Sequence, residues 1–327
     1  MKAIQVKGTS NGQPTLVWDD YPDPTSAEDE VLVRVHASAI NRADLSQAAG
    51  NYPPPPGASE ILGLEMAGAI VAVGPRVEEW QVGDRVCALL PGGGYAELAT
   101  VPAGMLMPIP DEWSYVQAAA IPEAWFTAYV NLFEEGKLIE GQSVLIHAGG
   151  SGVGTAAVQL ARLTGCRVFV TAGTEEKLAT CRELGAEVAV NYKEQDWLPR
   201  VLEATGQEGV NVILDPVGAN YLERNLRALT RFGRLVSIGL LSGAKAELDM
   251  SLILRNRLTI VGSTLRTRPG IEKEQITRNF TETFWPPLRK GLLKPIIDRT
   301  FPMQDAGMAH DYVRQDQNIG KVILVAG

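Results

Sequence analysis

The sequence predicts an α/β protein of two domains, one β-rich and one built on a doubly wound parallel sheet. Closely spaced turn signals run through about the first 120 residues, whereas strand-like and helix-like segments alternate from residue 143 onward. A glycine-rich turn joins the first of these strands to the helix that follows it. The length of 327 residues is enough for two domains of ordinary size.

The N-terminal part is predicted to form a small barrel-like β unit. Residues 31–38 (VLVRVHAS) alternate apolar and polar side chains, as a half-buried strand does. A second β-like run covers 63–74, with small residues that permit close packing. A third covers 96–101, after the turn at 91–94. The proline cluster 53–56 fits neither a helix nor a central strand, so we expect a surface loop there.

The middle of the chain is predicted to consist of βαβ units, because strand and helix patterns alternate there. It is preceded by a helical stretch over 118–133, in which Pro122 is a kink or a start. The tail, about 266–327, is expected to hold a long helix, a helix over 304–314 and a final strand over 321–325. The predicted strands are 143–148, 166–171, 187–191, 210–214, 234–238 and 258–263, and the predicted helices include 152–164 and 175–184.

The composition narrows the classes of partner and compartment. The formal net charge is -8, which disfavours nucleic acid as the main partner because phosphate binding needs a basic surface. The three cysteines lack CxxC spacing and suit a reducing compartment. The first residues lack a signal-peptide core, and no apolar run approaches the ~20 residues of a membrane span. We therefore expect a cytoplasmic protein without a membrane segment.

The most informative stretch is 143–154 (SVLIHAGGSGVG), where an apolar strand runs into a glycine-rich turn and a helix follows. A pyrophosphate needs free backbone N–H groups at a helix N-terminus, and side chains there block its approach. The alternative is a strand–helix turn that needs glycine but binds nothing. In the dinucleotide-binding spacing, Ser151 stands where the middle glycine is usual. The predicted dinucleotide cradle consists of Gly149, Gly150, Ser151, Gly152, Val153 and Gly154.

The end of the second strand of this series indicates which dinucleotide is bound. NAD-binding proteins usually place an acidic residue there, about 20 positions beyond the turn. No carboxylate occupies this strand end, and the sequence continues Ala172-Gly173-Thr174. The hydroxyl of Thr174, the ammonium of Lys177 and the phenol of Tyr192 suit the 2′-phosphate of NADP. Taken alone, Lys177 would be interpreted as a solvated helix lysine. We predict NADP(H) as the cofactor, with Gly173, Thr174, Lys177 and Tyr192 near this phosphate.

Several further motifs carry a family resemblance that spans essentially the whole chain. They are AINRADL (39–45), YPPPPG (52–57), LLPGGG (89–94), AAAIPEAW (118–125), HAG (147–149), SGVGT (151–155), TAG (171–173), NYK (191–193) and NIGK (318–321). With these motifs the chain resembles the zinc-free quinone oxidoreductase branch of the medium-chain dehydrogenase/reductase superfamily. Within that branch it looks most like the p53-inducible quinone oxidoreductase and its bacterial relatives.

The resemblance implies a fold and a domain arrangement. It implies a GroES-like catalytic domain formed by residues 1–121 and 266–327. A Rossmann domain, residues 122–265, is inserted between these two parts, and the active site is expected in the cleft. The last strand of the alternating series, 258–262, is apolar and β-branched, so at a sheet edge it needs a cover. Pairing across a two-fold axis would cover it, so we expect a homodimer, as the resemblance also implies.

The resemblance also bears on metal binding, because zinc alcohol dehydrogenases share this architecture. Their ligating cysteine corresponds to Asn41, and their ligating histidine belongs to a Gly-His-Glu motif that reads Gly63-Leu64-Glu65 here. Leucine cannot ligate zinc, and asparagine is a poor substitute for a thiolate. We therefore expect no metal, and we interpret Glu65 as a structural, hydrogen-bonded acid.

The expected activity is zinc-independent, NADPH-dependent reduction of a quinone. By resemblance, Asn41 lies near the nicotinamide and the substrate, Tyr52 donates a hydrogen bond or a proton to the reduced oxygen, and Thr127 contacts the cofactor. Asp44 is interpreted as an orienting acid, with helix capping as its alternative. The predicted catalytic residues are Asn41, Asp44, Tyr52 and Thr127, and further cofactor contacts are expected at Gly239, Thr264, Leu265 and Asn318.

Two other functions remain open at the level of sequence. One is NADPH-dependent reduction of the C=C bond of enones or alkenals, since both reactions need a hydride donor near an electrophilic carbon. The other belongs to a different class, a cofactor-binding redox sensor or an RNA-binding protein with little turnover. The acidic net charge argues against RNA.

Overall fold

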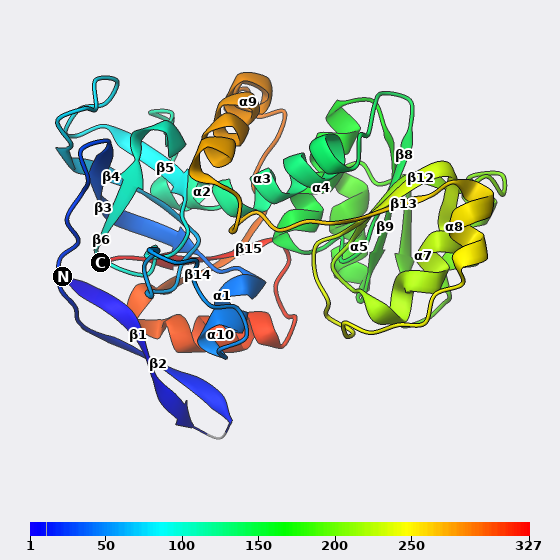
Figure 1. Ribbon diagram of the computed structural model, residues 1–327, viewed down its shortest axis with the longest axis horizontal. Helices are drawn as coiled ribbons and strands as arrows, with labels where there is room; N and C mark the ends of the chain where they lie inside the picture. The colour runs from blue at the N-terminus through cyan, green and yellow to red at the C-terminus, as the bar shows by residue number, and fades with distance from the viewer. Residues whose placement is uncertain (11) are drawn as a thin grey trace. The chain divides into compact units, whose positions relative to one another are not determined.

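The computed structural model describes residues 1–10 and 12–327, which form two compact units (Figure 1). Unit 1 consists of Met1–Phe126 and Arg266–Gly327, and unit 2 consists of Thr127–Leu265. The sequence predicts an inserted domain over 122–265; unit 2 begins at Thr127, inside helix α3 (Pro122–Tyr129).

Unit 1 is built on a mixed sheet in the order β14-β15-β3-β4-β5-β7, with β6 paired to β3. The predicted small-residue strand packs closely, because a Cβ added at Gly68 would lie 2.1 Å from the carbonyl oxygen of Arg34 on the neighbouring strand. The strands of this unit are β1 (Lys2–Ser10), β2 (Gln13–Asp20), β3 (Glu30–Ala39), β4 (Glu65–Val73), β5 (Arg85–Leu89), β6 (Leu98–Pro102), β7 (Leu106–Pro108), β14 (Ile297–Pro302) and β15 (Lys321–Val325). Its helices are α1 (Arg42–Ala48), α2 (Tyr115–Ala119), α9 (Gly270–Arg289) and α10 (Ala306–Arg314).

Unit 2 is a parallel sheet in the order β10-β9-β8-β11-β12-β13. Strands β9 and β10 are added on one side of β8, and strands β11 to β13 are added on its other side, so the strand order reverses between β8 and β11. This reversal is where open α/β sheets bind ligands, beyond the carboxyl ends of the strands. The strands are β8 (Ser143–Ile146), β9 (Arg167–Ala172), β10 (Val188–Asn191), β11 (Val210–Asp215), β12 (Leu229–Ser237) and β13 (Thr259–Gly262). The helices are α4 (Gly152–Leu163), α5 (Glu175–Glu183), α6 (Trp197–Ala204), α7 (Leu222–Ala228) and α8 (Met250–Asn256).

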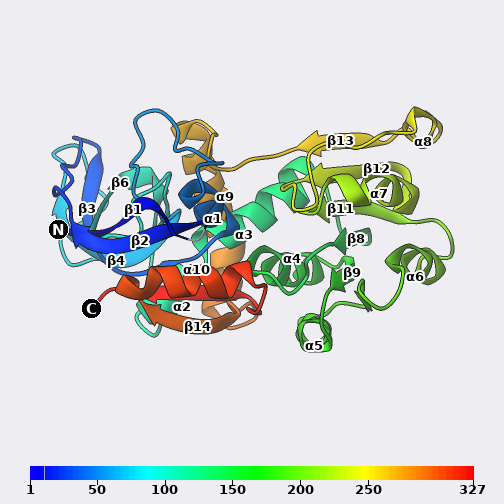
Figure 2. The same cartoon turned by 90° about the horizontal axis from the view of Figure 1, so that it is seen from below.

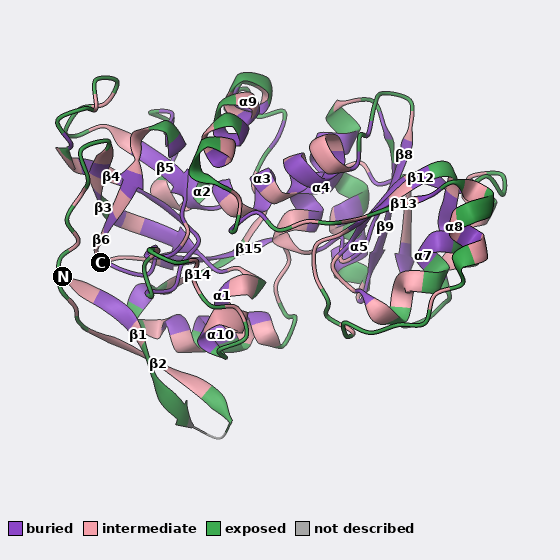
Figure 3. Cartoon of the chain, viewed as in Figure 1, coloured by how far each residue is buried: buried purple, intermediate pink, exposed green. Residues whose placement is uncertain are grey.

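The central strands of unit 2 are apolar because both of their faces are covered. Every residue of β8, a central strand of this sheet, is buried (Figure 3). Leu145, Phe169 and Ile213, from three of these strands, are fully buried in one hydrophobic cluster. Continuous apolar runs of this kind are typical of parallel sheets with helices on both sides. The predicted α/β fold class is confirmed.

Some segments depart from the sequence-based prediction. The helical stretch 118–133 is not one helix: α2 ends at Ala119, and Pro122 begins α3, a position that proline favours because it needs no backbone donor. The turns after α3, Val130–Glu135, form a π-helix, which local sequence patterns do not reveal. Strand β12 begins at Leu229, before the predicted 234: Leu229 pairs with Val210, and a register shift separates this pair from the regular pairing that starts at Arg234.

Strand β13 lies at the edge of its sheet, next to β12, as expected for 258–262 (Figure 2). Ile260 on this strand is 42% exposed. Among the residues that the structure describes, no helix has both the length and the apolar character needed to cross a membrane.

Candidate functional site

Asn41 and Asp44 lie together at the N-terminus of α1, where Asn41 is the N-cap. The backbone N–H of Asn41 donates to Asp44 Oδ2 at 2.8 Å. The same carboxylate accepts from the backbone N–H of Gly63 at 3.1 Å and from the Tyr95 hydroxyl at 3.2 Å. Asp44 is fully buried, and burial raises its pKa to about 6 although the two backbone donors lower it. Asp44 therefore caps α1 and also connects it to the segment before β4.

The side chain of Asn41 is held by a buried ion pair between Glu65 and Lys321. Lys321 Nζ donates to Glu65 Oε1 and to Asn41 Oδ1, both at 2.7 Å, and to the carbonyl of Ile40 at 3.1 Å. Asn41 Nδ2 donates in turn to Glu65 Oε1 at 2.8 Å. The Glu65 side chain is 0% exposed and that of Lys321 is 4% exposed. The ammonium thus directs all three of its N–H groups to fixed acceptors, and the Asn41 amide has a single orientation.

Arg266 contacts both the backbone and the ring of Tyr52. The Arg266 guanidinium lies 5.2 Å from the centroid of the Tyr52 ring and donates to the Tyr52 carbonyl at 3.2 Å. It also donates to the carbonyl of Pro91 at 2.8 Å and to Gln47 Oε1 at 2.7 Å. The Tyr52 hydroxyl has no hydrogen-bond partner among the described residues. Burial, followed by the charge of Glu123, raises the pKa of Tyr52, whereas Arg266 lowers it.

The glycine-rich turn of unit 2 leaves backbone donors exposed at the start of α4. Ser151 is the N-cap, and its hydroxyl accepts from the backbone N–H of Gly154 at 3.0 Å. The N–H groups of Gly152 and Val153 have no acceptor among the described residues. A Cβ at Gly154 would lie 2.4 Å from the carbonyl oxygen of Ala148, so a larger residue there would open the turn. Two free donors at a helix N-terminus fit an anionic group such as a pyrophosphate.

Lys177 lies against this turn and is not a solvated helix lysine. It is 6% exposed, and a Cβ at Gly150 would lie 2.8 Å from Lys177 Cγ. Its backbone N–H donates to the hydroxyl of Thr174, the N-cap of α5, at 3.3 Å. The structure therefore brings three of the predicted cofactor residues together.

Gly173 and Tyr192 form a second contact of the same kind. A Cβ at Gly173 would lie 2.9 Å from the Tyr192 hydroxyl and 3.0 Å from Lys193 Cε. Tyr192 is 41% exposed, so its hydroxyl is accessible to a ligand. The close approach explains why glycine follows β9, and it adds Lys193 to the cationic groups near the strand end.

The remaining predicted cofactor residues are spread along the chain. Gly239 follows β12, and a Cβ there would lie 2.9 Å from the carbonyl oxygen of Pro216 in the loop after β11. Thr264 is exposed and Leu265 is 7% exposed; both follow β13.

Thr127 and Asn318 belong to different units. Thr127 is half-buried in α3, and its carbonyl accepts from Asn131 Nδ2 at 2.7 Å. Asn318, in unit 1, donates its side-chain amide to the carbonyl of Gly320 at 2.8 Å. The geometry within each unit does not bring these two side chains to the other predicted residues.

Known proteins share the two parts of this chain. The family described as "Alcohol dehydrogenase GroES-like domain" matches residues 27–111, and the family described as "Zinc-binding dehydrogenase" matches residues 152–281. Quinone oxidoreductase of Rattus norvegicus is 30% identical over 327 residues, covering 99% of this chain and 98% of that protein. Escherichia coli quinone oxidoreductase complexed with NADPH aligns with a TM-score of 0.89 at 28% identity, covering 99% of this chain and all of the other. CurK enoyl reductase aligns with a TM-score of 0.87 at 27% identity, covering 100% and 99%.

The chain belongs to the quinone oxidoreductase branch of the medium-chain dehydrogenase/reductase superfamily. The resemblance to this branch is thereby confirmed, together with a GroES-like domain and a Rossmann domain.

One of the two matching families is described as zinc-binding, but the residues of this chain do not fit a zinc site. Leu64 carries no donor atom and is 1% exposed. The oxygens of Asn41 and Glu65 already bind the ammonium of Lys321, a fixed positive charge that opposes a divalent cation at the same atoms. No group of three or more metal-ligating side chains occurs within residues 1–10 and 12–327.

The sequence alone does not identify Lys321 and Arg266, two residues that hold the candidate site of this chain. In the sequence Lys321 stands out only as part of the NIGK motif, because its partner Asn41 is 280 positions away. Arg266 directly follows the predicted contacts Thr264 and Leu265, yet nothing local indicates that its guanidinium lies under Tyr52. A charged residue within an otherwise apolar strand, as at Lys321, was the one available signal.

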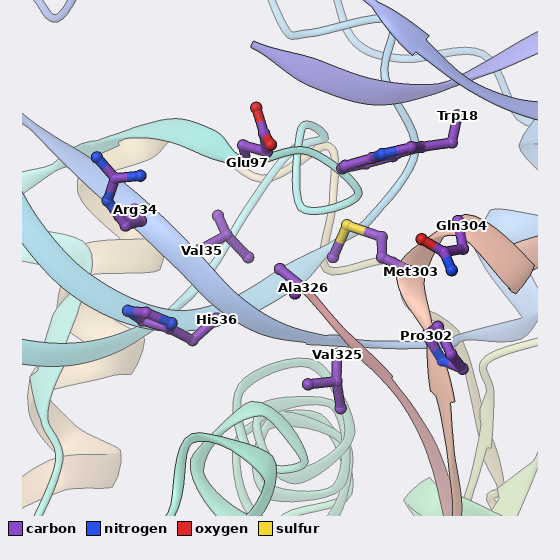
Figure 4. Close-up of a pocket in the computed structure, with 11 residues that line it drawn as sticks. Trp18, Arg34, Val35, His36, Glu97, Pro302, Met303, Gln304, Val325 and Ala326 are labelled. Atoms are coloured by element: carbon purple, nitrogen blue, oxygen red, sulfur yellow. The ribbon is translucent and has the colours of Figure 1, made fainter.

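A pocket in unit 1 is lined by residues other than the predicted site residues. This pocket, of about 420 Å³, is lined by Trp18, His36 and Met303 among others (Figure 4). In Figure 4, Trp18 and Met303 lie close together, apart from His36. His36 stacks on Tyr115 with ring centroids 4.4 Å apart. None of the predicted site residues lines this pocket, so we assign it no part in the reaction.

The three cysteines of the family member are all free and buried. Burial raises the pKa of Cys181 to about 12 and also raises the pKa of Cys87 and of Cys166. The thiols are therefore protonated at neutral pH, which supports their interpretation as core residues.

We expect Lys321→Met to destabilise the protein by about 3–5 kcal/mol, because Glu65 is left as a buried carboxylate without its cation. Urea unfolding of the variant and of the wild type measures the difference. The double variant Glu65→Gln/Lys321→Met removes both charges and should recover part of the loss. A double variant no more stable than the single one contradicts the assigned charge pairing.

Proposed function

We propose that the protein is an NADPH-dependent quinone oxidoreductase that works without a metal ion. The observation that carries the proposal is the glycine turn at the N-terminus of α4, with the free N–H groups of Gly152 and Val153 and with Lys177 packed against Gly150. Full-length similarity to quinone oxidoreductases, one of them solved with NADPH, supports it.

The cofactor phosphates are bound by unit 2 in this proposal. The turn 149–154 takes the pyrophosphate, and Lys177, Tyr192 and Thr174 face the 2′-phosphate, with Lys193 nearby. The end of β9 itself carries no carboxylate, and the acidic residues Glu175 and Glu176 come only in the first turn of α5. Gly239, Thr264, Leu265, Thr127 and Asn318 remain proposed contacts to the nicotinamide part of the cofactor.

When bound, the nicotinamide supplies the hydride. The protein's contribution is to orient the acceptor and to stabilise the charge that develops on its oxygen. Tyr52 is the proposed hydrogen-bond and proton donor, since its hydroxyl has no partner among the described residues and its ring is fixed by Arg266. Asn41 and Asp44 are proposed positioning residues, because their side chains are held by Lys321, Glu65 and backbone groups.

Reduction of the C=C bond of an enone or alkenal is the second candidate. The likeness to CurK enoyl reductase favours it, and the same donor groups would protonate the product. The two reactions differ in the acceptor and not in the cofactor or in the donor residues proposed above.

The proposed function predicts that purified protein oxidises NADPH with small ortho- or para-quinones, and that a chelator leaves the rate unchanged. Absorbance at the NADPH maximum measures this across quinones and alkenals. Turnover with alkenals alone supports the second candidate. Binding of NADPH without any turnover points instead to a redox sensor, and a salt-dependent filter-binding signal points to RNA.

A second prediction concerns the cofactor phosphate. Lys177→Met keeps the aliphatic stem against Gly150 but removes the ammonium, so the ratio of kcat/KM for NADPH over NADH should fall about 10- to 100-fold. Lys245→Met, at an exposed lysine of the same unit, serves as the control. An unchanged ratio in the Lys177 variant rules out this residue as a phosphate ligand.

We also propose a cytoplasmic homodimer that pairs through the edge strand β13. The free, buried cysteines fit a reducing compartment. The edge position of β13 and the exposure of Ile260 leave unpaired backbone groups that a second copy would satisfy.

Light scattering at micromolar concentration is expected to give the mass of a dimer. Ile260→Asp introduces a charge at the paired edge and should shift the mass toward the monomer. A wild-type monomer at this concentration rules out the proposed dimer.

A further inference from the structure

The part of unit 2 that contains β12, α8 and β13 is basic, although the whole chain has a net charge of -8. No aspartate or glutamate occurs in residues 224–246 or in residues 250–271. A locally basic surface on an acidic protein favours an anionic ligand through charge complementarity. Four arginines of this region lie where β12 begins and where α8 ends: Arg231, Arg234, Arg255 and Arg257.

Phe232 lies in a bulge of β12 and is held out toward solvent. Leu229 pairs with Val210, and the next pair is Arg234 with Val212, so β12 has extra residues between these two pairs. Phe232 is 56% exposed, and its φ of 66° lies in the left-handed region that a bulky residue rarely adopts. A large aromatic side chain that is exposed on a strained backbone contributes little to the core, which indicates a role at the surface.

Two guanidinium groups lie against the ring of Phe232. Arg231 Cζ is 5.2 Å from the ring centroid, and Arg257 Cζ is 4.8 Å from it. Arg257 is the C-cap of α8 with a φ of 53°, a conformation in which glycine is the usual residue. The backbone is therefore strained at two residues whose side chains meet at one ring.

The charges of Arg231 and Arg257 are not neutralised by the protein. Within residues 1–10 and 12–327, neither guanidinium forms an ion pair or a hydrogen bond. Two like charges held at one ring repel each other, and an anion bound to both would remove this repulsion.

The other two arginines of the region donate to protein acceptors. Arg255 donates to the carbonyl of Ser251 at 3.3 Å and to its hydroxyl at 2.7 Å. Arg234 Nε donates to the carbonyl of Glu135 at 2.8 Å. Of the four arginines, Arg231 and Arg257 are thus the two whose N–H groups are available to a ligand.

These residues lie at the opposite edge of the sheet from the glycine-rich turn. Phe232 and Arg257 come before the pair Arg234–Thr259, at which the regular parallel pairing of β12 and β13 begins. They are therefore at the amino ends of these strands, whereas the turn 149–154 follows the carboxyl end of β8. A ligand at Phe232 does not compete with a dinucleotide at the turn.

We propose that Arg231, Phe232 and Arg257 form a binding site for a small anion that carries phosphate or carboxylate groups. The two guanidinium groups donate to the anionic oxygens, and the ring between them keeps the planar donors in place. Guanidinium binds phosphate and carboxylate in the same bidentate geometry, so the shared chemistry defines the ligand class. This Arg231–Phe232–Arg257 site goes beyond the proposed function and does not depend on it.

Isothermal titration calorimetry with inorganic pyrophosphate and with citrate tests the site at about 0.15 M NaCl, where nonspecific attraction is screened. We expect saturable binding of at least one probe. The affinity should fall about 10- to 100-fold in Arg231→Met/Arg257→Met, because hydrogen bonds to charged groups are lost. The probe that binds more tightly identifies phosphate or carboxylate as the preferred group.

Arg200→Met is the matched control for the loss of charge. Arg200 is exposed on α6 of the same unit and pairs with Glu203 at 2.8 Å, so it is not available to the probe. This variant should bind both probes as the wild type does. Equal affinities of the wild type and of Arg231→Met/Arg257→Met for both probes overturn the proposal, and so does the absence of binding at this salt concentration.

The glycine-rich turn is a second place where pyrophosphate could bind, so the titrations are repeated with excess NADP. The Arg231–Phe232–Arg257 site should keep its affinity, since it lies at the other edge of the sheet. If excess NADP abolishes all binding of the probes, the proposal is overturned.

Phe232→Gly separates the loss of the site from a loss of folding. Glycine adopts a φ near 66° without strain, so the Tm should not fall. Binding of the probes should still weaken, because the guanidinium groups lose the ring that holds them. Wild-type affinity in Phe232→Gly contradicts the proposed site. If neither small anion binds but a short single-stranded RNA does, the surface serves a nucleic acid and the small-anion site is rejected.

Discussion

The ion pair between Lys321 and Glu65 is the contact on which the arrangement in unit 1 depends. It joins the last strand of the chain to β4 and, through Asn41, to the N-terminus of α1. Removing two charges from water costs several kcal/mol each, so the pair is retained only where both groups are fully hydrogen-bonded. Here the ammonium has three acceptors, and the carboxylate has donors at both oxygens. The pair therefore fixes the position of Asn41 and, through the backbone of Glu123, the start of α3.

Much of unit 2 could be predicted from local sequence. The central strands β8 and β9 lie close to the predicted ranges because each is an almost continuous apolar run that is buried on both faces. The sharp glycine turn before α4 could be predicted as well, since glycine is required there by steric limits that act within a few residues, such as the close approach of Gly154 to Ala148. The π-helix after α3 was missed because its hydrogen bonds leave no periodic signal over one turn.

The candidate site in unit 1 was less accessible to sequence reasoning. Asn41 and Tyr52 were found through motifs, but the groups that hold them, Lys321 and Arg266, lie more than 200 positions away along the chain. Whether a carboxyl group is charged depends on its donors in three dimensions. Asp44 and Glu65 resemble every other acid as letters in a sequence, and only the fold shows which donors each one meets.

The buried thiols have a chemical consequence for a protein that handles quinones. Quinones and enones are electrophiles that add to thiolates, and the attack requires both access and deprotonation. Cys87, Cys166 and Cys181 offer neither, because all three are buried and burial keeps each sulfur protonated. The chain can therefore meet its own substrates repeatedly without being alkylated at cysteine, and its lifetime during turnover is not limited by this reaction.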